Sequence, residues 1–150
     1  MNDATAVCVS QTLGCLHDIA DGLRHRQGPE LCHQFAEIAA VHAHADRPPD
    51  TDWARIVQLY DELVALAPSP VVELNRAAAI AMADGPDRGL TLIDRIEGLD
   101  DYYLLHAARA DLLRRGGRHE EAAASYRRAL QLATNPVERS FFERRLAEVG

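Results

Sequence analysis

Residues Tyr103–Pro136, YLLHAARADLLRRGGRHEEAAASYRRALQLATNP, contain the clearest structural pattern in the chain. In the first half of this stretch, Ala107, Ala110 and Leu113 recur at every third position. A helix with this spacing has a narrow apolar face made of small side chains. The pair Gly116-Gly117 follows, and glycine readily adopts the left-handed conformation that ends helices. We therefore predict a helix that stops at this glycine pair.

A second helix is predicted directly after the glycine pair. Glu120-Glu121 fall in its first turn, where negative side chains complement the positive end of the helix dipole. Its apolar face consists of Ala122, Tyr126, Ala129 and Leu130. Small side chains on both helices allow close approach, and Tyr126 would fill the space beside them. The two helices are thus expected to pack as an antiparallel pair.

The order of these small, glycine and aromatic positions is that of a tetratricopeptide (TPR) unit, which has a period of about 34 residues. One unit cannot bury its own apolar face, so neighbouring units are expected at a similar spacing. Gly85 precedes Gly117 by 32 residues and marks a second unit, although Asp94 and Glu97 are poor substitutes for the aromatic and alanine positions. A third unit, 34 residues further back, has Ile56, Tyr60, Leu63 and Pro68 at the corresponding places.

The remaining chain extends this pattern into an all-α prediction. We expect residues 1–12 to form a weakly ordered N-terminus and residues 13–150 to form a single TPR-like superhelix of about seven or eight antiparallel helices. The last helix, which begins at Pro136, would cap the superhelix because its outer face is polar. Its predicted outer residues are Glu138, Arg139, Glu143, Arg144, Arg145 and Glu148. The other predicted helices are Leu13–Leu23, Leu31–His42, Trp53–Leu66, one from Pro70 through Ala81, and roughly Asp87–Ile96.

Composition restricts the possible function. The net charge is −7, and the arginine clusters at 114–118 and 127–128 are interleaved with glutamates, so we expect no direct binding to nucleic acid. The three cysteines do not make a disulfide framework, which predicts reduced thiols and a cytoplasmic location. The sequence has neither a secretory signal nor an apolar stretch of membrane-spanning length, so we expect no membrane association.

Several segments resemble those of a known bacterial family, both in amino-acid sequence and in their order along the chain. They are AEIAAVHA (36–43), DTDW (50–53), LAPSPVVELNRAAAIAMADGP (66–86), YLLHAARADLLRR (103–115) and NPVERSFFERRLAEV (135–149). Over roughly residues 28–150 the chain is similar to the C-terminal TPR-like extension of extracytoplasmic-function RNA polymerase sigma factors. The promoter-reading and polymerase-binding regions of that family lie upstream of the extension and are not in these 150 residues. The resemblance implies a role in controlling transcription initiation, through contact with sigma-factor regions, RNA polymerase or another protein.

Stacked TPR units commonly bind a peptide or protein segment in a groove lined by their first helices. In the register described above, the groove-facing candidates are His42, Asn75, Arg76 and Asp111. Asparagine and arginine could hydrogen-bond a carboxylate or backbone groups of a partner segment. The alternative is that Asn75 and Arg76 satisfy neighbouring helix ends or lie in solvent.

His106 and Arg109 lie one helical turn apart, where the repeat normally has apolar residues. A charged group near a core needs a partner, so Asn75 or a carboxylate of a neighbouring helix is expected to bind Arg109. The two residues form a candidate polar network, with either a structural or a ligand-binding role.

Other chemistry finds little support in the sequence. No metal-ligand spacing, phosphate-binding loop or nucleophile motif is present, so we expect no metal, no cofactor and no enzymatic activity. Two alternatives to a sigma-factor-type module stay open. One is a stand-alone TPR adaptor unrelated to polymerase, and the other is a helical domain that senses a small molecule.

Overall fold

The computed structural model describes residues 29–44 and 50–150 of the chain. Within these residues the chain forms seven helices and no strand, which confirms the all-α prediction. The predicted weakly ordered stretch 1–12 and the predicted helix Leu13–Leu23 lie outside the described residues. The helices are α2 (Pro29–His44), α3 (Trp53–Leu66), α4 (Pro70–Asp84), α5 (Pro86–Ile93), α6 (Tyr103–Arg115), α7 (His119–Leu132) and α8 (Pro136–Val149).

Side-chain caps explain why three of the helices begin where the sequence predicts. Asp52, Ser69 and Asn135 each accept a hydrogen bond from a backbone N–H in the first turn of α3, α4 and α8, respectively. Such caps satisfy N–H groups that have no partner within the helix. Pro70 and Pro136 follow two of these caps at the first helical position, where proline loses no hydrogen bond.

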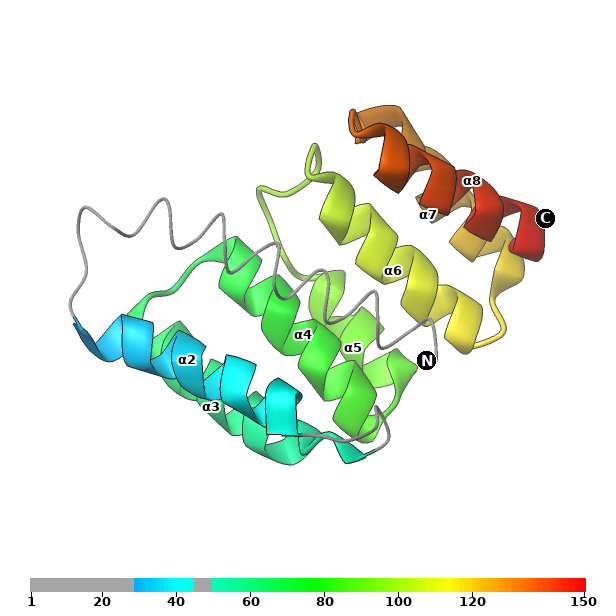
Figure 1. Ribbon diagram of the computed structural model, residues 1–150. Coiled ribbons are helices and arrows are strands. Elements are labelled where there is room, and N and C mark those ends of the chain that lie inside the picture. Colours follow the sequence, from blue (N-terminus) through cyan, green and yellow to red (C-terminus); the bar gives the residue numbers. More distant parts are fainter. Residues whose placement is uncertain (1–28, 45–49) are drawn as a thin grey trace.

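The helices form a row with two layers (Figure 1). In this view α2, α4, α6 and α8 lie in front, and α3, α5 and α7 lie behind them. Among the described helices, the main contacts join consecutive elements, with a smaller contact between α4 and α6. The packing of the row is therefore built mostly from neighbours in the sequence.

The described core consists of two hydrophobic clusters that share α4. The first cluster joins α2, α3 and one side of α4, and its fully buried members include Ile38 and Tyr60. The second joins the other side of α4 to α5, α6, α7 and α8, with Tyr126 and Phe142 among its large side chains. Because α4 is buried on both sides, it connects the two ends of the row.

Two glycines shape the turns between the layers. Gly85, with φ of 106°, separates α4 from α5, and Gly117, with φ of 76°, lies between α6 and α7. Residues with a side chain rarely adopt these positive φ values, so both turns favour glycine. The predicted end of α6 at the Gly116-Gly117 pair is thus confirmed.

Two sequence predictions about helices need correction. Helix α5 ends at Ile93 and not near Ile96, because Arg95 and Ile96 donate to carbonyls only three residues back and tighten the chain into a turn. The side chain of Arg145, predicted on the outer face of α8, is buried. It donates to Glu148 at 2.7 Å, and its guanidinium lies 5.3 Å from the centroid of the Phe141 ring.

Candidate functional site

His42 lies near the C-terminal end of α2, against α3. Its ring meets the Trp53 ring edge to face, with 5.3 Å between the ring centroids. Neither ring nitrogen of this half-buried side chain has a hydrogen-bond partner among the residues that the structure describes. Burial lowers the pKa of His42 below its ordinary value of 6.5, because the protonated ring would lose solvation. The neutral ring therefore retains its capacity to donate or accept a hydrogen bond.

Asn75 and Arg76 are adjacent on α4 but have different surroundings. Asn75 is only 5% exposed, and its side-chain nitrogen Nδ2 has no hydrogen-bond partner in the described part of the chain. Arg76 is half-buried, and its Nε donates to Asp61 Oδ1 of α3 at 2.5 Å. The arginine charge is thus paired within the chain, whereas the asparagine keeps an unused donor.

Asp111 is a buried carboxylate on α6. Its Oδ1 accepts a hydrogen bond from Arg114 Nη2 at 2.7 Å, one turn along the same helix. Burial opposes the charge of Arg114, but the contact with Asp111 outweighs this effect and raises the pKa of the guanidinium. Burial, together with the nearby Asp111 charge, raises the pKa of the Tyr126 hydroxyl. Asp111 therefore serves a local ion pair beside the aromatic core of α7.

The four predicted groove residues thus come from α2, α4 and α6, which are three helices of the front layer (Figure 1). Each has its own local surroundings, and no direct hydrogen bond links any two of them within the described residues. Two of them, Arg76 and Asp111, are neutralised by ion pairs. The unused polar capacity lies at Asn75 and His42.

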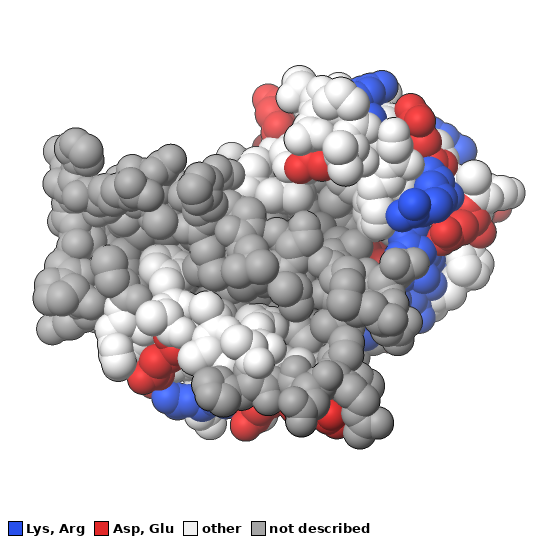
Figure 2. Space-filling model, in the orientation of Figure 1, with Lys and Arg blue, Asp and Glu red and all other residues white. Residues whose placement is uncertain are grey.

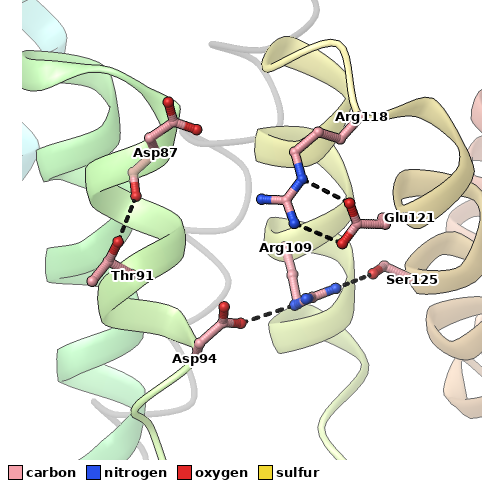
Figure 3. Close-up of polar contacts among 7 residues, drawn as sticks. All are labelled: Asp87, Thr91, Asp94, Arg109, Arg118, Glu121 and Ser125. Atoms are coloured by element: carbon pink, nitrogen blue, oxygen red, sulfur yellow. Dashed lines mark hydrogen bonds and ion pairs between the residues drawn. The ribbon is translucent and has the colours of Figure 1, made fainter.

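Arg109 connects three elements through one guanidinium group (Figure 3). Its Nε donates to Asp94 Oδ1, directly after α5, and its Nη1 donates to Ser125 Oγ of α7, both at 3.0 Å. His106 has a separate contact, in which Nε2 lies 2.7 Å from the carbonyl oxygen of Asp100. The two residues that the sequence joined in one candidate network therefore bind different partners.

Charged side chains from α5 to the first turn of α7 interact with Arg109 or with Arg118, and we call this group the α5–α7 charge cluster. Its members are Asp87, Asp94, Arg109, Arg118 and Glu121 (Figure 3). Arg118 donates to both carboxylate oxygens of Glu121 at 2.7 Å. This bidentate contact raises the pKa of Arg118 and lowers the pKa of Glu121. The cluster has three carboxylates and two arginines that largely neutralise one another.

A second polar feature was not predicted from the sequence. Arg127, Leu130, Gln131 and Arg139 line an open hollow of about 440 Å³ where α7 meets the first turns of α8. Figure 2 shows arginine side chains gathered, with some acidic ones between them, over the α6–α8 end of the face in view. The available sequence signal was the excess of arginine after residue 102, with nine arginines against six acidic residues.

Two kinds of site are not found in the described part of the chain. Residues 29–44 and 50–150 contain no group of three or more His, Cys, Asp or Glu side chains that could hold a metal ion. No helix within these ranges is both long enough and apolar enough to cross a membrane.

Comparison with known proteins identifies a bacterial relative of this chain. An uncharacterized protein of Rhizobium meliloti (strain 1021) is 42% identical to this chain over 130 residues. The match covers 85% of this chain but only 30% of that relative. No model of a known protein family matches the chain. No solved structure matches it either. The chain is therefore similar to one segment of a much longer bacterial protein.

Proposed function

We propose that this chain is a TPR-like helical-repeat module that binds a protein segment and acts in the control of transcription initiation. The resemblance to the C-terminal extension of extracytoplasmic-function sigma factors suggests the process. Its partner would be the sigma-factor regions themselves, RNA polymerase or another regulatory protein. In this proposal the module is non-catalytic.

The positions of equivalent residues support a repeat. Gly85 and Gly117, which are 32 residues apart, both have positive φ values and both separate a front helix from a back helix. Tyr60 of α3 and Tyr126 of α7 are equivalent in the predicted register, and each is 1% exposed in its own hydrophobic cluster. A glycine with positive φ and a buried tyrosine thus each occur at two places along the row.

The middle repeat departs from this pattern in a way that the structure explains. Asp94 occupies the position of Tyr60 and Tyr126 in the register. Helix α5 is only 8 residues long and ends at Ile93, so Asp94 lies beyond the helix and binds Arg109 instead of filling the core. An acidic residue at this position is therefore compatible with a repeat whose second helix is short.

The observation that carries the docking proposal is the side-chain nitrogen of Asn75, which has no hydrogen-bond partner among residues 29–44 and 50–150. A buried donor without an acceptor costs roughly 1–3 kcal/mol. Asn75 is nevertheless buried on α4. Helix α4 lies between α2 and α6 in the front layer (Figure 1). A carbonyl or carboxylate oxygen of a bound segment would satisfy this donor and give the residue a function.

Calorimetry tests the proposal directly. The 150-residue chain would be titrated with the promoter-reading and polymerase-binding regions of a sigma factor from the same organism. We expect micromolar or tighter binding, of about −8 kcal/mol or better. The variant Asn75→Leu, which keeps the branched shape of the side chain but removes the amide, should weaken this binding at least tenfold, about 1.4 kcal/mol.

The free energy of unfolding of the same variant provides the control. Because Nδ2 has no partner among the described residues, Asn75→Leu should not lower this free energy, and removal of the unpaired donor should raise it by up to about 1–3 kcal/mol. Loss of helicity would instead show that Asn75 is structural. Absence of binding, with both proteins folded, would reject the sigma-factor partner and favour a stand-alone adaptor.

A further inference from the structure

The hollow between α7 and α8 has the composition of a small binding site. Arg127, Leu130 and Gln131 come from the last turns of α7, and Arg139 comes from the first turn of α8. The site thus offers two guanidinium groups, one amide and one apolar side chain. It is open to solvent and has a volume of about 440 Å³, which is enough for a few residues of an extended segment.

Arg139 is held in place by the end of α7. Its Nη1 donates to the carbonyl oxygens of Leu130 at 2.7 Å and Ala133 at 3.0 Å, which uses both N–H groups of that nitrogen. Nε and Nη2 have no acceptor among the described residues. These two nitrogens form the side of a guanidinium that matches the two oxygens of a carboxylate. Arg139 is therefore positioned before any ligand binds.

Arg127 supplies a second cation that no described residue neutralises. It is exposed, and it forms no ion pair with the described residues. By contrast, the adjacent Arg128 binds Asp101 at 3.0 Å, and Arg118 binds Glu121. The hollow is thus a place where arginine charge is left available in a chain of net charge −7.

The surrounding charges favour a single carboxylate over a polyanion. Helices α7 and α8 together contain five arginines and five glutamates, so a nucleic acid laid along them would meet equal numbers of both signs. A glutamate or aspartate side chain needs only the two arginines of the hollow. An apolar neighbour in the same segment would cover Leu130, and its backbone would hydrogen-bond Gln131.

We propose that this hollow binds an acidic protein segment, with one carboxylate held between Arg127 and Arg139. The site lies on α7 and α8, whereas Asn75 lies on α4, so the two are separate surfaces. This inference does not depend on a sigma-factor partner. It adds a second contact whose chemistry is defined by two arginines.

Nuclear magnetic resonance can test this with the whole chain labelled with ¹⁵N. The probe is an acetylated and amidated peptide in which glutamate alternates with leucine, and the control peptide has glutamine in place of glutamate. We expect saturable shifts of the Arg139 Nε–H signal and of the Leu130 and Gln131 backbone amides with the glutamate peptide only.

The matched variants are Arg127→Glu and Arg95→Glu. Both change an exposed arginine that has no ion pair among the described residues, but only Arg127 lines the hollow. We expect Arg127→Glu to weaken binding of the glutamate peptide at least about tenfold, and Arg95→Glu to leave it unchanged. Asn75→Leu should also leave it unchanged, which separates this result from the sigma-factor experiment.

Four results would overturn the proposal. They are equal binding of the glutamine peptide, no effect of Arg127→Glu, no saturable shift in the hollow, and binding of a phosphoserine peptide without binding of the glutamate peptide. The last result would assign the hollow to phosphate. Unchanged helicity of Arg127→Glu by circular dichroism would show that its effect is local.

Discussion

Hydrogen bonds from a single side chain can join several helices around the second cluster, and Arg109 is the clearest example. Arg109 binds Asp94 on one side and Ser125 on the other, and so connects α5, α6 and α7. The sequence predicts that this arginine needs a partner, because it stands at a usually apolar position. The sequence alone does not identify Asp94 as that partner. Its carboxylate comes within reach of Arg109 because α5 ends at Ile93, earlier than the sequence predicts.

Replacing Arg109 with alanine should lower the free energy of unfolding by about 1–2 kcal/mol. Most of this loss of stability comes from Ser125. This residue is 6% exposed, and its hydroxyl would lose the hydrogen bond that Arg109 donates to it. The contribution of Asp94 is smaller, because its side chain is 55% exposed and is well screened by water. Urea unfolding of the variant measures the difference.

The matched control for Arg109→Ala is Arg95→Ala. Arg95 is exposed and has no ion pair in the described part of the chain. Arg95→Ala should therefore change the free energy of unfolding by no more than about 0.5 kcal/mol. If both variants unfold at the same urea concentration as the parent chain, Arg109 makes no net contribution and its contacts are incidental.

Whole helices pack closely where small residues meet, and α4 and α5 provide the clearest case. A Cβ atom added at Gly89 would lie 2.5 Å from Ala81 Cβ and 2.9 Å from both the Ala77 carbonyl oxygen and Leu112 Cδ1. The backbone of α5 therefore approaches α4 as far as glycine permits. The sequence predicts close packing from its alanines, but it does not distinguish Gly89 from a glycine that merely weakens a helix.

The substitution Gly89→Ala should destabilise the chain by about 1–3 kcal/mol, because α5 must move away from α4. Intrinsic helix propensity alone predicts the opposite sign, with a gain of nearly 1 kcal/mol. Thermal unfolding decides between the two effects. Gly116→Ala is the control, since its Cβ would meet no heavy atom nearer than 3.4 Å. A higher melting temperature for Gly89→Ala would contradict the packing argument.

The row formed by the described helices contains two hydrophobic clusters that meet at α4. Ile38 belongs to the first cluster and is fully buried, whereas the large second cluster contains none of α2 or α3. A substitution that weakens packing in the first cluster should therefore destabilise mainly α2 and α3. After such a substitution, the packing of the second cluster, which joins the other side of α4 to α5, α6, α7 and α8, should stay intact.

Ile38→Ala should test this division. We expect the free energy of unfolding of the region around Ile38, which comprises α2 and α3, to fall by about 2–5 kcal/mol. Hydrogen exchange of backbone amides should become faster in α2 and α3 than in α6 and α7. Val137→Ala, at a residue that is 78% exposed, should change neither region. Equal acceleration in all helices would show that the chain unfolds as one unit.

At this scale the sequence predicts the all-α fold class, because local signals mark the starts of three of the seven described helices. Asp52, Ser69-Pro70 and Asn135-Pro136 are capping and proline positions that can be identified without tertiary information. Burial of Arg145 and the hollow at Arg127 could not be predicted in the same way. Both depend on how α8 meets the preceding helices, and helical periodicity alone does not fix that geometry.

The order of the helices in the row also determines how fast the chain can fold. Each helix finds its main partners within the adjacent helices, so only short segments need to close during folding. The entropy lost in closing such loops is small, and helical chains dominated by local contacts fold in about microseconds to milliseconds. A growing chain could therefore complete each contact soon after the next helix has been synthesised, without waiting for its C-terminus.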